Sequence, residues 1–583
     1  MNALEQFQNK MREKGIDYYY LCMGDDHNSE FIHPFYKTIE YLTGFTGSAG
    51  QLVIERDHVI LWSDGRYYIQ AKKQIEGKSI EFYDLTMPSP IEYIQSRYSK
   101  NQVIAFDGRI VNYKTGLALQ KIGRVKSEEY IIDEIWNDRP GLGKDKIFIL
   151  EQKYCGVSLQ EKIQIVRDLM KQNHTSYFLL ETLDDIAWLL NLRGYDVISN
   201  PVFLSFLLIS EKEITLYIDL DKCDKDVCDY LKENDIQLQE YSKVYEDVKN
   251  IQDSIWMDPS NISYNFVACC KGTIHFEVNP TEILKAIKNN IEIENLRQCH
   301  LMDSVALTKF IYWLKKNVGT MDLDEYNVSL YLKELRKQIP GYIEVNYGCI
   351  SAYNENAAMM HYQATEQMHS KLKAEGLYLV DSGGQYKTGT TDYTRTIALG
   401  DVCEEWKKDF TTVLISHAHL ANAVFLEGCS GMNLDVLARE PIWKRYLDYQ
   451  CGTGHGLGFC LGVHEGPHGL RWYKSEKRKE DTPLQAGMIV TNEPGIYIEN
   501  SHGIRIENDM LVIEKVKNHY GQFLGFETLN FVPIDLECII PSLLDKETKQ
   551  WLNEYHTLTY QKLSPYLTRE EAQWLKENTV EVE

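Results

Sequence analysis

The sequence lacks the features of a secreted or membrane-embedded protein. It has no run of about 18 apolar residues that could cross a bilayer. Its first residues, Met-Asn-Ala-Leu-Glu-Gln-Phe, contain neither the basic start nor the apolar stretch of a signal peptide. The 13 cysteines are scattered and form no C-x-x-C motif, which favours reduced thiols in a cytoplasm. We therefore predict a cytoplasmic protein with no membrane partner.

Positive charge is also scarce in this chain. Its 62 Lys and Arg residues face 85 Asp and Glu residues, for a formal net charge of -23. A surface of this charge repels nucleic acid, so we predict no nucleic-acid partner. With 583 residues the chain is too long for one hydrophobic core, and its 44% hydrophobic and 25% charged residues are typical of globular domains.

Two segments of the first half resemble diverged copies of one unit. The first is predicted to run through a helix at 4–14, an apolar strand at 18–21, a glycine-bearing turn at 41–50, and strands at 52–54 and 58–62. The second is predicted to repeat this order, with a helix at 159–172, a strand at 177–180, a turn at 186–194, and strands at 203–209 and 214–218. The repeat predicts two α/β domains of similar fold.

Proline and glycine mark the predicted domain boundaries. They cluster at 138–144, and a second boundary is expected near Asn279-Pro280. A strongly helical segment is predicted at 294–317 after that boundary, because its apolar residues follow a helical period. We assign residues 1–145 to a first domain, 146–290 to a second, and 291–583 to a catalytic domain with a C-terminal extension.

Four carboxylates and one histidine stand out between residues 381 and 507. Asp381 ends a predicted strand, Val380-Asp-Ser-Gly-Gly-Gln-Tyr386, and Asp392 follows eleven residues later, a spacing at which a hairpin brings two carboxylates together. His455 lies in Gly452-Thr-Gly-His-Gly-Leu-Gly458. Glu493 precedes a Pro-Gly turn, and Glu507 is expected at the end of an alternating strand. Each residue is thus predicted at a strand end or a glycine bend, where backbone can approach a ligand closely.

Four carboxylates cannot converge without positive charge, because like charges at short range force protonation. Two divalent cations would supply that charge. An oxygen-rich donor set with one imidazole suits Mn²⁺, Co²⁺ or Zn²⁺. Taken singly, Asp-Ser-Gly and Glu-Pro-Gly are ordinary turns, and Gly-Thr-Gly-His-Gly lacks the Gly-Lys-Ser/Thr ending of a phosphate loop. The ordered combination carries the prediction.

The order Asp381, Asp392, His455, Glu493, Glu507 resembles the metal ligands of the pita-bread metallopeptidases, a family that includes methionine aminopeptidase, prolidase and Xaa-Pro aminopeptidase. The sequence motifs around these residues are most similar to those of the Xaa-Pro aminopeptidase branch of the family. Phe45-Thr-Gly-Ser-Ala-Gly50, Asp185-Ile-Ala-Trp-Leu-Leu-Asn-Leu-Arg-Gly194 and Trp551-Leu-Asn-Glu-Tyr-His556 extend the resemblance over nearly the whole chain. The resemblance implies an α/β (α+β) protein with two creatinase-like N-terminal domains and a pita-bread catalytic domain.

The resemblance also implies roles for these residues. Asp381 would bind one metal, His455 and Glu493 the other, and Asp392 and Glu507 both, with Mn²⁺ the leading cofactor and Co²⁺ or Zn²⁺ as alternatives. Glu493 would be the general base for a hydroxide that bridges the two metals. The implied substrates are peptides with proline at the second position, and the implied assembly is a homodimer.

Four further residues are assigned by the resemblance. His361 and His464 correspond to substrate histidines that bind the peptide and stabilise the tetrahedral intermediate, so they are counted with the catalytic residues. Arg505, two residues before Glu507, is expected to contact substrate and to orient a metal carboxylate or His361. Arg66, in Ser63-Asp-Gly-Arg-Tyr67, resembles a first-domain arginine that contacts substrate.

Two features depart from the family pattern. His455 and Glu493 lie 38 residues apart, and the charged segment 474–480 is expected to hold the surplus as a solvent-facing loop. Tyr353-Asn-Glu-Asn-Ala stands where the family has a Gly-Pro-Asn-like turn. The alternative functions are a prolidase acting on Xaa-Pro dipeptides, a metal-free pita-bread binding module, and a creatinase-like hydrolase without metal. The presence of all five ligands argues against the last two.

Overall fold

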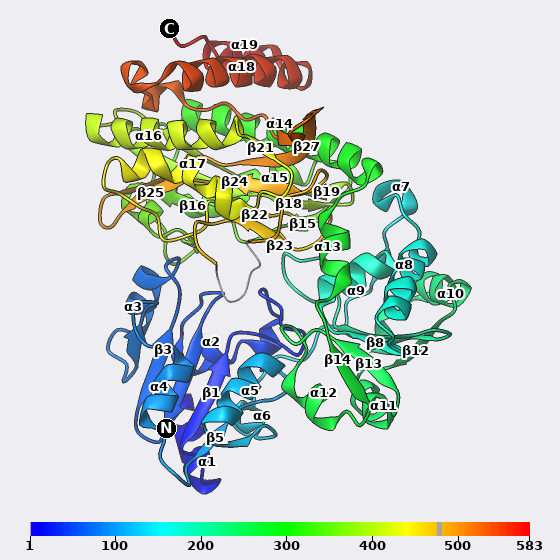
Figure 1. Ribbon diagram of the computed structural model, residues 1–583. Coiled ribbons are helices and arrows are strands. Elements are labelled where there is room, and N and C mark those ends of the chain that lie inside the picture. Colours follow the sequence, from blue (N-terminus) through cyan, green and yellow to red (C-terminus); the bar gives the residue numbers. More distant parts are fainter. Residues whose placement is uncertain (1, 475–480) are drawn as a thin grey trace. The chain divides into compact units, whose positions relative to one another are not determined.

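The computed structural model describes residues 2–474 and 481–583, and this part of the chain folds into two compact units (Figure 1). Unit 1 contains residues up to Gln152 together with Val157–Thr281. Unit 2 contains the short segment Lys153–Gly156 and Glu282–Glu583. The five residues that the sequence predicts as metal ligands all belong to unit 2.

Unit 1 contains two six-stranded sheets of the same topology. The first has the strand order β4-β3-β2-β1-β5-β6 and the second β12-β11-β10-β8-β13-β14. In both sheets the second, third and fourth strands of the order pair antiparallel with one another: β3, β2 and β1 in the first sheet, and β11, β10 and β8 in the second. All other neighbouring strands pair parallel. The strands of the first sheet are β1 (Tyr18–Cys22), β2 (Gln51–Glu55), β3 (Val59–Trp62), β4 (Glu81–Tyr83), β5 (Val103–Ala105) and β6 (Arg124–Lys126). Those of the second are β8 (Tyr177–Leu180), β10 (Ser205–Ser210), β11 (Ile214–Ile218), β12 (Ile236–Glu240), β13 (Ser254–Met257) and β14 (Thr273–Phe276). The predicted duplication is confirmed; the boundaries at residues 145 and 290 stay predictions.

The helices of unit 1 repeat in the same way. The first copy carries α1 (Ala3–Glu13), α2 (Thr38–Thr43), α3 (Tyr68–Ile75), α4 (Pro90–Arg97), α5 (Tyr113–Ile122) and α6 (Ile131–Ile135), and the second carries α8 (Leu159–Gln172), α9 (Leu183–Leu190), α10 (Lys225–Glu233), α11 (Val244–Asn250) and α12 (Tyr264–Cys269). The capping box of Ser158 and Glu161 begins α8 at the residue that its apolar period predicts. The helix predictions at 4–14 and 159–172 are confirmed.

The turn predictions at 41–50 and 186–194 were wrong in part. Residues 41–43 belong to α2, and residues 186–190 belong to α9. Each helix ends at a residue in the left-handed conformation, Gly44 with φ 76° and Asn191 with φ 51°. Such a cap satisfies the last helical carbonyls. The glycine and asparagine therefore mark the end of a short helix that precedes the turn.

Unit 2 is built from several antiparallel sheets. One contains β16 (Ile350–Tyr353), β17 (Leu377–Ser382) and β20 (Tyr393–Ala398), and another contains β15 (Tyr342–Val345), β18 (Gly384–Tyr386) and β19 (Gly389–Thr390). The largest has the order β21-β28-β27-β24-β22-β23, with β21 (Val424–Leu426), β22 (Gly454–Gly456), β23 (Glu465–Leu470), β24 (Ile489–Asn492), β27 (Asn508–Asn518) and β28 (Gly521–Thr528). A hairpin of β25 (Gly495–Ile498) and β26 (His502–Arg505) lies between β24 and β27 in the chain.

Long helices pack on these sheets. They are α14 (Asn290–Asn317), α15 (Glu325–Arg336), α16 (Glu404–Ala421) and α17 (Gly431–Trp443), preceded by α13 (Pro280–Ala286). The predicted helix at 294–317 begins four residues earlier, because Asn289 and Glu292 form a capping box. One face of α14 packs on the β16–β17–β20 sheet through Leu307, Phe310 and Tyr378. The mixed architecture of unit 2 agrees with the predicted fold class.

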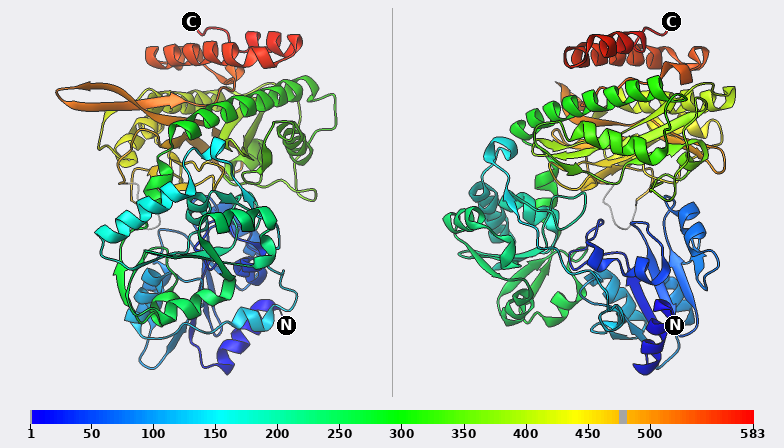
Figure 2. Two further views of the ribbon diagram at one scale, coloured as in Figure 1. Left: turned by 90° about the vertical axis from the view of Figure 1, so that its right-hand side faces the viewer. Right: turned by 180° about the vertical axis from the view of Figure 1, so that it is seen from behind.

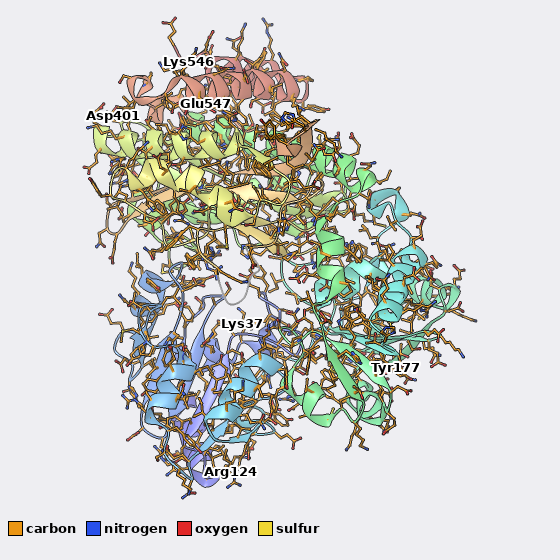
Figure 3. All side chains as sticks on the ribbon, viewed as in Figure 1. Lys37, Arg124, Tyr177, Asp401, Lys546 and Glu547 are labelled. Carbon is orange, nitrogen blue, oxygen red and sulfur yellow. The ribbon has the colours of Figure 1, made fainter. Side chains whose placement is uncertain are left out.

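The C-terminal extension forms α18 (Lys546–Leu563) and α19 (Arg569–Glu577), which pack on α14 and α16 as an outer layer of unit 2 (Figure 2). Lys546 and Glu547 begin α18 on its exposed side (Figure 3). The opposite side is buried, and its Tyr555 hydroxyl accepts a hydrogen bond of 2.7 Å from Arg395 Nη2 in β20. Residues 475–480 of the predicted charged loop lie outside the described residues.

Candidate metal centre

The β17–β20 hairpin brings the first two carboxylates together. In its antiparallel register Asp381 pairs with Thr394 and Ser382 with Tyr393, so Asp392 lies one residue before β20, beside the end of β17. The hydroxyl of Tyr347 lies within hydrogen-bond distance of both carboxylates, at 2.6 Å from Asp392 Oδ1. The predicted strand-turn-strand convergence of the two aspartates is confirmed.

The large sheet supplies the other three residues. His455 lies in β22, Glu493 directly follows β24, and Glu507 lies between β26 and β27. The prediction that Glu507 ends a strand was therefore wrong by two residues, because β26 already ends at Arg505. Glycine is required at Gly454, where a Cβ would come within 1.9 Å of the Thr491 carbonyl oxygen. That close approach of β22 to β24 sets His455 beside Glu493.

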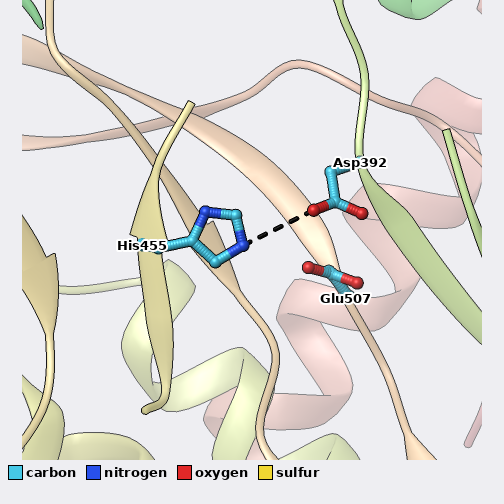
Figure 4. A group of neighbouring side chains, drawn as sticks. All are labelled: Asp392, His455 and Glu507. Carbon is cyan, nitrogen blue, oxygen red and sulfur yellow. Dashed lines mark ion pairs between the residues drawn. The ribbon is translucent and has the colours of Figure 1, made fainter. Parts of the chain in front are cut away.

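Ligand atoms of Asp392, His455 and Glu507 lie within 4.8 Å of one another (Figure 4). His455 Nε2 is 3.5 Å from Asp392 Oδ2 and 3.5 Å from Glu493 Oε1. The other ring nitrogen, Nδ1, is 2.9 Å from the Gly456 carbonyl oxygen, to which its N–H donates. This bond fixes the tautomer, so the lone pair of Nε2 faces the carboxylates.

Arg505 Nη2 forms an ion pair with Asp381, one of the two partners expected for it. Its Nε donates to Thr394 Oγ1 at 3.0 Å and its Nη1 to the Tyr497 hydroxyl at 2.6 Å. Thr394 Oγ1 in turn donates to Glu507 Oε2 at 2.6 Å. Arg505 therefore connects Asp381 in β17 with Glu507 in the β26–β27 connection, the latter through Thr394.

The cluster is strongly acidic and buried. Burial, followed by the charges of Asp381 and Asp509, raises the pKa of Asp392 well above its ordinary value. Burial, followed by the charges of Asp392 and Glu493, does the same to the pKa of Glu507, and burial raises the pKa of Glu493. Divalent cations would keep these groups ionised at neutral pH. The donor set, oxygen-rich with one correctly oriented imidazole, thus fits a pair of such ions.

The two additional histidines also lie in unit 2. The His464 ring is 4.4 Å from the His455 ring, edge to face at 82°. His361 is half-buried and follows the short helix η4 (Asn354–Ala358), which packs against β25 and β26. This helix contains most of the segment Tyr353-Asn-Glu-Asn-Ala, which departs from the family pattern. Asn356 anchors the helix by donating a hydrogen bond to Glu325 Oε1 at 2.9 Å.

Arg66 belongs to unit 1, unlike the other predicted site residues. Its guanidinium pairs with Asp64 at 2.8 Å and with Glu30 at 3.4 Å. These neighbours balance its charge within the first repeat. A contact of Arg66 with substrate stays a prediction.

Several residues near the carboxylates were not predicted from the sequence. Tyr347 contacts both aspartates, and Asp509 Oδ2 accepts the Asp392 backbone N–H at 2.9 Å. The same Asp509 oxygen is 2.8 Å from His300 Nε2. Asp509 and Thr394 each follow a predicted ligand by two residues, a spacing that could have indicated them. Tyr347 and His300 carry no comparable signal, since they lie far from the motifs in the chain.

Comparisons with known proteins extend over the same regions. Residues 294–514 match metallopeptidase family M24, residues 4–135 and 138–292 match the Creatinase/Prolidase N-terminal domain, and residues 522–582 match the C-terminal region of peptidase M24. The probable Xaa-Pro aminopeptidase P of Paracoccidioides brasiliensis (strain Pb03) is 34% identical over 612 residues, covering 99% of this chain and 98% of that protein. The chain belongs to metallopeptidase family M24 and, within it, to the Xaa-Pro aminopeptidases.

Other relatives also match most of the chain. Aminopeptidase P2 of Arabidopsis thaliana is 35% identical over 97% of this chain and 86% of its own length. The solved structure of an X-prolyl aminopeptidase from Caenorhabditis elegans covers 100% of both chains with a TM-score of 0.95 and 30% identity. That protein is described as a cytosolic enzyme with a di-nuclear active site. An Xaa-Pro dipeptidase from Bacillus anthracis, at 24% identity and a TM-score of 0.51, shares the fold over 65% of this chain.

None of the described helices is both long enough and apolar enough to cross a membrane.

Proposed function

We propose that this chain removes the N-terminal residue from peptides whose second residue is proline, using two divalent metal ions held in unit 2. The main support is the convergence of Asp392, His455 and Glu507 on one point, within 4.8 Å, in a chain that aligns with Xaa-Pro aminopeptidases over its full length. The di-nuclear site described for the Caenorhabditis elegans enzyme supports a pair of ions.

Asp381 would hold one metal, and His455 and Glu493 the other. Asp392 and Glu507, the most buried of the carboxylates, would contact both. When bound, the ions supply positive charge that keeps the carboxylates ionised, polarises the scissile carbonyl and acidifies a water molecule. Mn²⁺ is the cofactor we propose, because carboxylates outnumber imidazole in the donor set; Co²⁺ and Zn²⁺ would fit the same ligands.

Glu493 is the residue we assign as the general base. Its side chain is 20% exposed, whereas those of Asp392 and His455 are 6% and 7% exposed. A base must reach the water from which it removes a proton, and this carboxylate has the most open position. Thr491 Oγ1 donates at 3.2 Å to Glu493 Oε1, the same oxygen that faces His455 Nε2, and so helps to orient the carboxylate.

His464 and His361 are proposed to bind the peptide and to stabilise the negative charge that develops on its carbonyl oxygen. The edge-to-face contact with His455 supports this for His464, because it places the ring at the border of the ligand group. Arg505 would hold Asp381 in position through their ion pair. Arg66 is kept as a proposed substrate contact from unit 1.

The preference for proline would require a dedicated pocket. Proline lacks the N–H that ordinary aminopeptidases use, and its ring restricts the residue before it. A fixed site for the free amine together with space for the ring would select such peptides. We further propose that the enzyme is cytoplasmic, as the Caenorhabditis elegans relative is described to be, and that it forms a homodimer.

The test is cleavage by metal-free protein that has been reloaded separately with Mn²⁺, Co²⁺ or Zn²⁺. Each form is assayed on Arg-Pro-Pro, Arg-Ala-Ala and the dipeptide Ala-Pro. We expect metal-dependent release of arginine from Arg-Pro-Pro and none from Arg-Ala-Ala, and the most active metal would identify the cofactor. Cleavage of Ala-Pro alone would instead assign a prolidase. No cleavage of any of the peptides under any metal, together with no retained metal, would refute the enzyme hypothesis and favour the metal-free binding module.

A further inference from the structure

A loop of eight residues, 457–464, connects β22 to β23, and it lies between the two candidate site histidines His455 and His464. His455 lies just before this loop and His464 is its last residue. The ends of the loop meet where Gly456 pairs with Glu465 in the β22–β23 ladder. The relative position of the two imidazole rings therefore depends on how this base is held.

Lys288 lies at the base of the loop although it is far away in the sequence. It belongs to the short connection between α13 and α14, and its backbone N–H donates to the Gly487 carbonyl at 2.9 Å. Its side chain is fully buried, as is that of Glu465, with exposures of 0% and 3%. Lys288 Nζ donates to the Leu457 carbonyl oxygen at 2.7 Å and forms an ion pair with Glu465.

One ammonium group thus joins both ends of the loop. Leu457 is the first loop residue and Glu465 directly follows His464. A buried ion pair contributes little net stability, since desolvation opposes the attraction. Its two partners do, however, fix a geometry that a flexible apolar contact would leave loose.

The far end of the loop is held separately. The Leu461 carbonyl oxygen accepts hydrogen bonds from Gln385 Nε2 at 2.7 Å and from Thr390 Oγ1 at 3.1 Å. Gly458 N–H donates to the Gly462 carbonyl at 3.1 Å within the loop. The tip is therefore held without Lys288, whereas Lys288 contacts the base, which carries His464.

We propose that Lys288 is a positioning residue of the active site: paired with Glu465, it closes the base of the 457–464 loop and thereby holds His464 against His455 for contact with the peptide. Lys288 touches neither substrate nor metal ligand side chains in this account. The inference rests on the proposed function, because it acts through the substrate role of His464.

The experiment is a double-mutant cycle between Lys288→Met and His464→Ala, with kcat and KM measured on Arg-Pro-Pro at saturating metal. We expect Lys288→Met to lower kcat/KM about tenfold in the wild-type background and by less than about threefold in His464→Ala. The second loss is smaller because the imidazole that Lys288 positions is already absent in His464→Ala. Bound metal should stay at the wild-type stoichiometry, and Lys288→Arg should recover part of the activity. Glu465→Gln in the same two backgrounds gives an equivalent cycle if Lys288→Met does not fold.

Lys315→Met is the matched control, because it breaks another ion pair in unit 2, between Lys315 and Asp535 at 2.6 Å, that involves no predicted site residue. Its kcat/KM should stay within about twofold of wild type. Equal losses from Lys288→Met in both backgrounds, or a loss that follows missing metal, would overturn the inference and leave the proposed function intact. Full activity of His464→Ala by itself would refute the proposed role of His464, and the inference would fall with it.

Discussion

Replacement of Thr394 by valine tests how the cluster holds its carboxylates. Thr394 is fully buried, and its hydroxyl donates to Glu507 Oε2 at 2.6 Å while it accepts from Arg505 Nε at 3.0 Å. Valine has nearly the same volume, so the substitution removes these two hydrogen bonds without leaving a cavity. Glu507 would lose the donor that orients it, and the Arg505 N–H would lose this acceptor.

The expected effect is on metal affinity. Loss of a hydrogen bond that orients a metal ligand weakens binding about 10- to 100-fold, or about 1.4–2.8 kcal/mol. The unpaired arginine N–H adds about 1–3 kcal/mol of lost folding stability. Saturating metal should recover most of kcat, because Glu493, the proposed base, is unchanged.

Competition with a chelator of known affinity measures the metal dissociation constants of Thr394→Val and wild type. Thr559→Val is the matched control, since Thr559 is equally buried but donates to a backbone carbonyl within α18, at 2.8 Å. It should bind metal as wild type does. Wild-type metal affinity in Thr394→Val would refute the reasoning that Thr394 orients Glu507 for the metal.

Three further predictions concern catalysis, the C-terminal extension and pH. Glu493→Gln should lower kcat by about 10²–10⁴ at saturating metal, as measured by steady-state rates, with metal analysis to show that both ions are bound; a smaller loss would exclude it as the base. Tyr555→Phe should cost about 1–3 kcal/mol in the unfolding free energy of unit 2, because the Val532 N–H, 3.0 Å from that hydroxyl, loses its acceptor; unchanged denaturation midpoints would contradict this. Burial raises the pKa of Asp392 and Glu507, so the metal-free fold binds more protons than the unfolded chain, and its stability falls as pH rises above about 4. The gain in Tm on adding metal should therefore be larger at about pH 7.5 than at about pH 5.5, and a pH-independent gain would disagree.

Much of unit 1 could be predicted from local pattern. The helix at 159–172 has an apolar period and a capping box, and the strands around it alternate with turn residues, so its local preferences agree with the final structure. The short helices α2 and α9 were mistaken for turns, because the residues that end them, Gly44 and Asn191, are also typical turn residues.

The residues proposed as metal ligands could be selected from the sequence because each lies in a short, distinctive motif, and the order of the motifs is specific. The residues that hold these side chains in place could not be predicted, because a contact between distant segments produces no motif in the local sequence. Tyr347 reaches Asp392 across 45 residues, and Lys288 reaches Glu465 across 177. Such partners become visible only when the sheets of unit 2 bring the segments together.

The central claim is that the five-residue cluster holds two metal ions on which cleavage before proline depends. The most direct measurement is a titration of metal-free protein with Mn²⁺, following both bound metal and the rate of arginine release from Arg-Pro-Pro. The account predicts binding that saturates at about two equivalents per chain, with activity that appears as the sites fill. Undiminished cleavage by the metal-free protein, or an Asp392→Asn variant that binds and cleaves as wild type does, would contradict it.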